Sequence, residues 1–236
     1  MTEGRGQLLA VWAHPDDETY LMAGIMASAV REGRGVVCVT ATKGEAGSQD
    51  EERWPRDRIA DIRAAELQRA LSILGVRDHR WLGYRDGECP KVPDDEAIGK
   101  VASIVEEVRP EIVFTFGPDG HTGHPDHVCV HRWTRAAFDT SAPAGARLVY
   151  PVVTPEWAER FLPVLEPYDV FAPGTPRIVE RAELAVCLEL SPELLDLKVT
   201  ALRAQASQTE GLVQAVGESF FREGLSQETF ELGTSR

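Results

Sequence analysis

The sequence of 236 residues is poor in cysteine and in positive charge, and both shortages exclude classes of protein. Its four cysteines lie about 40 or more residues apart, at Cys38, Cys89, Cys129 and Cys187. This spacing excludes a disulfide framework or a cysteine-rich zinc knuckle. Asp and Glu number 38 against 25 Lys and Arg, which gives a formal net charge of −13. Nucleic acids and anionic membranes bind basic surfaces, so we expect neither as a partner.

Long hydrophobic runs are also missing. No apolar run approaches the roughly 18–20 residues that span a bilayer. The apolar run at 8–13 is too short for the core of a signal peptide, and a polar segment follows it directly at residue 14. We therefore expect a cytoplasmic protein. Hydrophobic residues make up 43% and charged residues 27%, which is ordinary for a globular protein with a substantial core.

Three widespread nucleotide-binding and catalytic motifs are absent from the sequence. It contains no G-x-G-x-x-G motif after the first apolar run and no G-x-x-x-x-G-K-[ST] phosphate-binding loop. It also lacks a G-x-S-x-G nucleophile elbow. These absences argue against a dinucleotide-dependent enzyme, a P-loop NTPase and a serine hydrolase.

What the sequence does contain is an alternation of buried strands and amphipathic helices. Apolar runs predict strands over 8–13, 36–41, 78–84, 111–116 and 147–153. Helical spacing of apolar residues predicts helices over 20–31, 56–74, 94–108 and 125–138. Alternation at this spacing implies right-handed crossovers between parallel strands. The predicted fold is α/β: a Rossmann-like, doubly wound, mainly parallel sheet with helices on both faces.

Residues 1–236 are expected to form a single domain, because no linker divides them. Residues 1–153 would be the α/β core, and 154–236 a C-terminal extension packed on it. In the extension we expect a strand near 183–190, a helix over 192–208 and then a glycine-containing tail of loops around a site.

The first predicted strand runs directly into His14-Pro15-Asp16-Asp17-Glu18. Four of these five residues can bind a metal or carry a proton. They lie where the carboxyl ends of strands hold ligands in open α/β sheets. The alternative is a polar turn whose carboxylates stabilise the start of the next helix. The position directly behind a buried strand favours a functional site.

A second polar segment follows the fourth predicted strand and holds three of the six histidines: His121, His124 and His127. Histidine is a common zinc ligand, and a catalytic zinc takes three protein ligands and a water. In the usual doubly wound order, strands 1 and 4 are neighbours. His14 and Asp17 should then meet His127 across the crevice between these strand ends, as one site with an open coordination position.

The pair His14-Pro15-Asp16-Asp17-Glu18 and His124-Pro125-Asp126-His127 resembles the two signatures of the LmbE-like, or PIG-L, family of zinc-dependent N-acetylglucosaminyl deacetylases. The resemblance extends to segments 42–45, 63–66 and 84–87, and covers most of the chain up to about residue 138. It implies that His14, Asp17 and His127 bind one Zn²⁺ per chain, with Fe²⁺ as the alternative metal.

The resemblance also implies catalytic roles for Asp16, His124 and Asp126. Asp16 would be the general base that activates the attacking water. His124 would assist at the tetrahedral intermediate, and Asp126 would orient His124.

Substrate binding is implied for Arg63, Asp86 and Glu45, which match positions of the family's substrate pocket. The alternatives are a helix-surface salt bridge for Arg63 and a turn aspartate for Asp86. The sequence departs from the family at Thr122, where some members carry a tyrosine that acts as an acid. Threonine cannot serve as that acid.

The predicted function is therefore zinc-dependent hydrolysis of an N-acyl, most simply N-acetyl, group on a small N-acetylglucosamine-type conjugate. One alternative is an amidase that acts on a thiol or peptide conjugate with the same metal site. Another is a non-catalytic module that binds metal or sugar, but pure binding would need neither Asp16 nor His124. The sequence leaves a homo-oligomer open.

Overall fold

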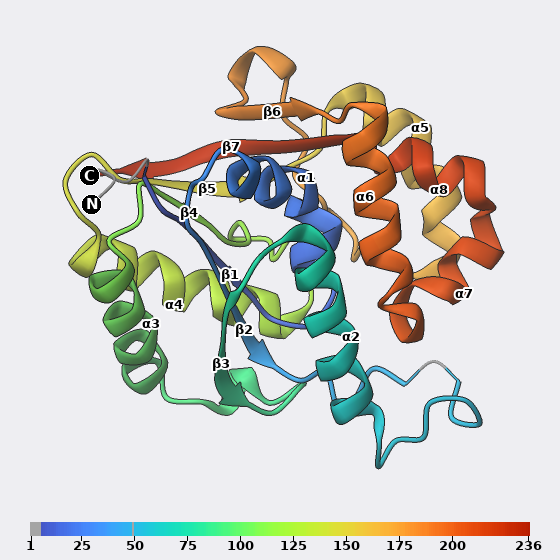
Figure 1. Ribbon diagram of the computed structural model, residues 1–236, viewed down its shortest axis with the longest axis horizontal. Coiled ribbons are helices and arrows are strands. Elements are labelled where there is room, and N and C mark those ends of the chain that lie inside the picture. Colours follow the sequence, from blue (N-terminus) through green and yellow to red (C-terminus); the bar gives the residue numbers. More distant parts are fainter. Residues whose placement is uncertain (1–5, 49) are drawn as a thin grey trace.

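In the computed structural model, which describes residues 6–48 and 50–236, seven strands form one sheet in the order β3-β2-β1-β4-β5-β7-β6 (Figure 1). The five strands of the core are β1 (Leu8–Trp12), β2 (Val36–Thr42), β3 (Asp78–Tyr84), β4 (Ile112–Phe114) and β5 (Arg147–Pro151). These five strands are parallel, and β1 pairs with both β2 and β4. The predicted doubly wound, mainly parallel sheet and the neighbourhood of strands 1 and 4 are confirmed.

Helices cover both faces of the sheet (Figure 1). On one face, α6 (Pro192–Arg203) packs against α1 (Asp17–Arg31) and α2 (Ile59–Leu74); on the other, α3 (Asp94–Val108) packs against α4 (Pro125–Ser141). Their ends follow from the sequence. Gly75 closes α2 in the left-handed conformation, at φ 81°, and Pro125 occupies the first turn of α4, where its missing N–H costs no hydrogen bond.

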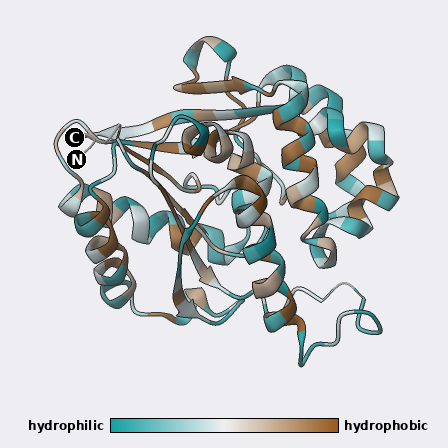
Figure 2. Cartoon of the chain, viewed as in Figure 1, coloured by the Kyte–Doolittle hydropathy of each residue, from teal (hydrophilic) through white to brown (hydrophobic). Residues whose placement is uncertain are grey.

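The core lies between these layers. Every residue of β1 and of β2 is buried, as expected for parallel strands covered on both faces. Figure 2 shows hydrophobic residues along the central strands and hydrophilic ones on the outer faces of the flanking helices. Strands packed in this way hold the segments that follow their carboxyl ends in fixed positions.

The C-terminal extension differs from the expectation. Its tail is not a set of loops: it forms α7 (Ala206–Val216), α8 (Glu218–Gly224) and β7 (Gln227–Ser235). The expected helix over 192–208 ends at Arg203, and α5 (Pro155–Leu165) was not predicted. The remaining elements are β6 (Val186–Glu189) and short 3-10 helices at Cys89–Lys91, Glu166–Tyr168 and Arg181–Glu183. The glycines separate short elements: Gly217, at φ 85°, lies between α7 and α8.

Residues of the extension continue the sheet of the core. β7 lies antiparallel between β5 and β6. A buried ion pair adds a polar connection: Lys198 Nζ donates to Glu228 Oε1 at 2.9 Å, and the Glu228 carboxylate also accepts from the backbone N–H groups of Gly24 and Ile25. These contacts support our proposal that the whole chain is one domain.

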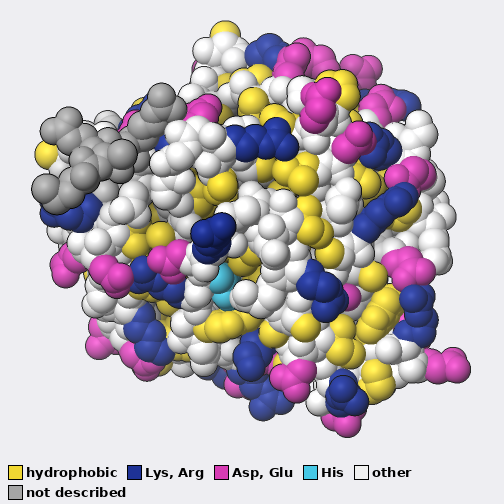
Figure 3. Space-filling view, viewed as in Figure 1, with side chains coloured by type: hydrophobic (Ala, Val, Ile, Leu, Met, Phe, Trp, Pro, Cys, Tyr) yellow, Lys and Arg dark blue, Asp and Glu magenta, His cyan; other side chains and the backbone are white. Residues whose placement is uncertain are grey.

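Charged side chains of both signs are interspersed over the face shown in Figure 3. Among the residues that the structure describes, no helix has the length and hydropathy needed to cross a membrane.

Candidate metal centre

The two polar segments meet at the carboxyl ends of β1 and β4. His14 follows β1, while His124 precedes α4 and His127 lies in its first turn. One ring nitrogen from each of these three histidines lies within 4.8 Å of the other two, and Nδ1 of His14 is 3.1 Å from Nε2 of His127.

Asp17 joins the same group of atoms. Its carboxylate oxygens lie 3.8 Å from Nδ1 of His14 and 3.5 Å from Nε2 of His127. Ligands about 2.0–2.1 Å from a tetrahedral zinc ion are about 3.3 Å from each other. The separations among these two nitrogens and the carboxylate therefore fit atoms arranged around a single small cation.

Hydrogen bonds on the far side of each ring indicate which nitrogen carries the proton. Nε2 of His14 lies 3.0 Å from Asp86 Oδ1 and 3.2 Å from Asp126 Oδ2, and Nδ1 of His127 lies 2.9 Å from the carbonyl oxygen of Gly120. A carbonyl or carboxylate oxygen only accepts, so these nitrogens carry the protons. The lone pairs of His14 Nδ1 and His127 Nε2 then face each other, which is unfavourable unless a cation or a proton lies between them.

The pKa of His14 is consistent with this arrangement. Burial lowers it, but hydrogen bonds to Asp126 and Asp86 and the charge of Asp17 outweigh burial and raise the pKa to about 10. Burial lowers the pKa of His127 to about 4, so this ring is neutral and its Nε2 can act as a ligand. The surroundings therefore favour positive charge between the two rings. The donor set, two imidazole nitrogens and a carboxylate, fits a divalent metal ion.

His124 is held differently from the other two histidines. Its Nδ1 accepts a hydrogen bond from the backbone N–H of Asp126 at 3.2 Å. Burial, together with the charge of His14, lowers the pKa of His124, so the ring is neutral and its proton lies on Nε2. This makes His124 a hydrogen-bond donor at the centre and less suited than Asp17 to bind a metal.

The carboxylate of Asp126 supports His14 and not His124, which differs from the expectation. It accepts hydrogen bonds from the backbone N–H groups of Gly87 at 2.7 Å and Cys89 at 3.2 Å, and it contacts His14 Nε2. The hydrogen bond to His124 Nδ1 comes from the backbone N–H of Asp126 and does not involve its carboxylate. Its side chain is therefore free to connect His14 to the segment after β3.

Asp16 stands next to these groups in an unusual backbone conformation, with φ 125°. Such a φ is strained for a residue with a Cβ atom, and strain of this kind concentrates at functional sites. Burial raises the pKa of its carboxyl group to about 7, with Asp17 and Glu18 also raising it and Arg63 opposing them. A pKa near neutrality suits a general base.

Arg63 is almost fully buried, with 4% of its surface exposed. It donates from Nη2 to the carbonyl oxygen of Pro15 at 2.8 Å and from Nη1 to that of Gly44 at 3.1 Å, and it lies 3.5 Å from Asp16 Oδ1. It also lines the cavity described below. Arg63 is therefore no surface salt bridge; it holds the peptide that presents Asp16.

Asp86, which follows β3, is hydrogen-bonded to Glu45 and Ala46 of the loop after β2. Glu45 Oε2 accepts from the backbone N–H of Asp86 at 3.1 Å, and Asp86 Oδ2 accepts from that of Ala46 at 2.9 Å. Asp86 lines the cavity, whereas Glu45 borders a smaller pocket with Trp81 and Tyr84. Substrate contact for either residue stays a prediction.

His121 lines the cavity too, although the sequence pattern did not single it out from its neighbours. It has φ 62° and is 8% exposed, and its Nδ1 is buried without a hydrogen-bond partner among the described residues. The nearby Thr122 has its hydroxyl 3.2 Å from His127 Nδ1. The histidine cluster was the only signal in the sequence, and it could not show which rings point into the cavity.

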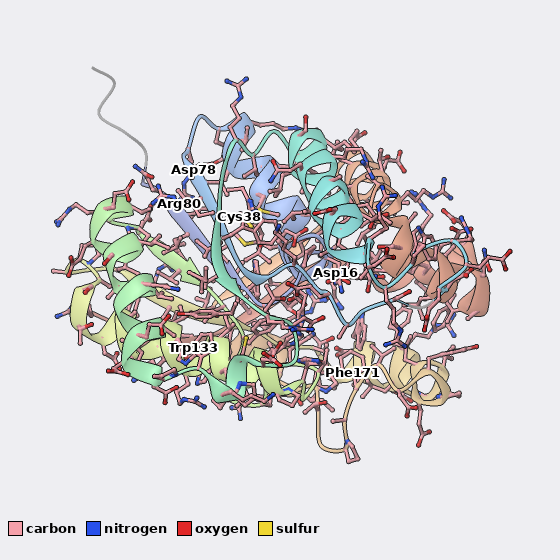
Figure 4. The ribbon with its side chains drawn as sticks, turned by 90° about the horizontal axis from the view of Figure 1, so that it is seen from below. Asp16, Cys38, Asp78, Arg80, Trp133 and Phe171 are labelled. Carbon is pink, nitrogen blue, oxygen red and sulfur yellow. The ribbon has the colours of Figure 1, made fainter. Side chains whose placement is uncertain are left out.

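A cavity of about 770 Å³ opens over the candidate metal centre. Its polar side comes from the strand ends and includes Asp16 (Figure 4) and the metal-binding candidates. Its opposite side comes from α5, α7, α8 and residues 168–171, and is mostly hydrophobic.

Solved structures share this fold at low sequence identity. N,N′-diacetylchitobiose deacetylase from Pyrococcus horikoshii matches with a TM-score of 0.62 and 23% identity, over 96% of this chain and 83% of its own. A zinc-inhibited form of teicoplanin deacetylase Orf2 matches with a TM-score of 0.68 and 21% identity, over 96% and 97%. GalB, a hydratase, also matches, with a TM-score of 0.64 and 16% identity over 98% of each chain, so the fold alone does not determine the reaction.

Sequence relatives are closer. The 1D-myo-inositol 2-acetamido-2-deoxy-alpha-D-glucopyranoside deacetylase of Rhodococcus erythropolis is 31% identical over 88% of this chain and 83% of its own. The protein of the same name from Mycobacterium sp. (strain KMS) is 33% identical over 93% and 79%. The family model for PIG-L, GlcNAc-PI de-N-acetylase, matches residues 9–138, which hold both polar segments. The chain therefore belongs to the PIG-L family, as the two segments predicted.

Proposed function

We propose that this protein is a metal-dependent N-deacetylase that hydrolyses the N-acetyl group of a small N-acetylglucosamine-type conjugate. The observation that carries the proposal is the close approach of His14 Nδ1 to His127 Nε2, 3.1 Å apart, with the Asp17 carboxylate beside them and the strained Asp16 next to it in the chain. The names of the sequence relatives support the substrate class.

The metal would be held by His14, Asp17 and His127, one ion per chain. When bound, such an ion supplies Lewis acidity, which polarises an amide carbonyl and acidifies water. We propose Zn²⁺, with Fe²⁺ as the alternative, because imidazole and carboxylate ligands suit both and affinity order alone does not select the metal in a cell.

The remaining residues would act on the substrate and on protons. Asp16 takes a proton from the attacking water and passes it to the amide nitrogen as the C–N bond breaks, so that acetate and a free amine leave. His124 donates from Nε2 to the oxygen that becomes negatively charged during attack. Asp86 and Asp126 keep the proton of His14 on Nε2. Arg63 holds Asp16 in position and faces the substrate.

Two other functions differ from the proposed one in the substrate or in the absence of turnover. An amidase acting on a thiol or peptide conjugate would use the same metal site and differ only in substrate. A non-catalytic module would bind metal or sugar without turnover, and would have no use for the strained Asp16 conformation or its pKa of about 7.

The test is acetate release from a panel of N-acetylglucosamine conjugates with inositol, malate, lipid-linked and oligomeric partners. The proposal expects turnover of soluble conjugates, about one divalent ion per chain, and loss of activity on chelation with an unchanged circular dichroism spectrum, because the buried strands carry the fold. Full activity in a demonstrably metal-free sample would overturn it. We also propose a cytoplasmic location, which fractionation of cells would test.

A further inference from the structure

The cavity over the candidate metal centre has a second side that the proposed reaction does not need. Its large hydrophobic side chains include Trp157, Phe161, Phe171, Leu212, Phe220 and Phe221. They come from α5, α7, α8 and the segment at residue 171, all in the C-terminal extension. Phe171 and Asp16, both labelled in Figure 4, line the same cavity from its two sides.

The aromatic rings form a continuous series that starts at His121, which lines the same cavity as the candidate metal centre. His121 meets Phe171 edge-on, with ring centroids 5.8 Å apart. Phe171 meets Trp157 at 6.2 Å, Trp157 meets Phe161 at 5.1 Å, and Phe161 meets Phe220 at 4.9 Å. Each ring thus supports the next, so the hydrophobic side is a packed wall and not a set of independent side chains.

The wall offers carbon surface and little hydrogen bonding. The indole N–H of Trp157 already donates to the carbonyl oxygen of Gly224 at 2.9 Å. The hydroxyl group of Tyr168, another lining residue, donates to the carbonyl oxygen of Ala215 at 3.4 Å. Thr229 donates to Val152, also within the protein. A polyol placed here would leave hydroxyl groups without partners, which is costly in a hydrophobic site.

We propose that the substrate carries an alkyl or aryl group that this wall binds while the sugar amide lies at the metal centre. This inference rests on the proposed deacetylase function and narrows its substrate class. The hydrophobic group belongs either to the partner attached to the sugar, which leaves the N-acetyl group of the proposed function unchanged, or to a longer N-acyl chain that takes the place of the acetyl group. Either source would present the same hydrophobic surface to the wall, and the experiment below distinguishes the two sources.

The experiment measures kcat and KM for two series of compounds. In the first, alkyl glycosides of N-acetylglucosamine run from methyl to hexyl; in the second, the N-acyl chain of the methyl glycoside runs from acetyl to hexanoyl. Transfer of a methylene group from water to a hydrophobic site is expected to raise kcat/KM by up to about fourfold. We expect a rise of at least about tenfold across one of the two series, mainly through KM.

Variants of the wall test whether these residues cause the rise. Phe171→Gln and Phe220→Gln should flatten the dependence on chain length. Leu232→Gln changes an exposed hydrophobic residue of β7 that is not among the lining residues, and it should leave the dependence intact. Turnover that is independent of chain length in both series, or equal slopes in the wall variants and the control, would overturn the inference.

A binding measurement separates this inference from the proposed function. Alkyl glucosaminides have no amide to hydrolyse, and calorimetry can follow their binding without turnover. The inference predicts tighter binding and a more negative heat-capacity change as the alkyl chain lengthens. If no compound is turned over but this trend is present, the reaction is wrong and the hydrophobic site stands. If the trend is absent, the hydrophobic site is wrong.

Discussion

Nδ1 of His14 lies 3.1 Å from Nε2 of His127, although the two residues are 113 positions apart in the sequence. The contact exists because β1 and β4 are adjacent and parallel, so that the segments after them leave the sheet at the same edge. Hydrogen bonds behind both rings orient His14 Nδ1 and His127 Nε2 toward each other. The geometry of the fold thereby creates a position that favours a cation.

His124 should matter for turnover and not for metal binding. His124→Ala removes the donor at the centre and should lower kcat by about 10²–10³, the usual effect of one such donor. His124→Gln places an N–H close to the position of Nε2 and should recover part of that loss. Both variants should keep their metal in elemental analysis. Loss of the metal in both would instead make His124 a ligand.

The buried pair Lys198–Glu228 should stabilise the attachment of the C-terminal extension to the core. Lys198→Met leaves the Glu228 carboxylate buried without its counter-ion, and should lower the free energy of unfolding by about 3–5 kcal/mol. Arg203→Met, which breaks the exposed pair of Arg203 with Glu218, is the control and should change it by less than about 1 kcal/mol. Equal effects in thermal or denaturant unfolding would contradict this account.

Gly44 should be required for the position of Arg63. A Cβ atom at Gly44 would lie 2.2 Å from Nη1 of Arg63, and the residue has φ 69°. Gly44→Ala should therefore displace the guanidinium group, release the peptide before Asp16, and reduce kcat while the metal is retained. Gly174→Ala is the matched control, since φ there is 84° and the space beside it is open. If both variants lose the same activity, backbone strain alone explains the effect.

The sequence allowed prediction of the sheet because buried parallel strands are encoded locally, as uninterrupted apolar runs. β1 and β2 are the clearest examples, and the order of β1 and β4 then followed from topology. The extension could not be predicted in the same way. Its elements α7, α8 and β7 are short, and they depend on distant partners such as the pairing of β7 with β5.

The candidate site could be predicted at the level of segments but not of individual contacts. Two polar segments after two buried strands suffice to place His14, Asp17 and His127 together. The direction of a side chain depends on tertiary contacts, which is why the contact of Asp126 with His14 was missed. The hydrophobic wall was missed because its rings come from elements that only the folded extension brings together.

Metal content measured beside kcat in Asp16→Asn and Asp17→Ala tests the central claim most directly, that Asp17 binds the metal and Asp16 serves as the base. The two carboxylates are neighbours in the chain, so a general effect of charge should treat them alike. We predict that Asp17→Ala loses both the metal and the activity, and that Asp16→Asn keeps about one ion per chain while kcat falls by about 10²–10⁴. Loss of the ion in Asp16→Asn with retention in Asp17→Ala would show that the two roles are exchanged. If both variants kept the metal and the activity, the metal centre could not lie at the carboxyl end of β1.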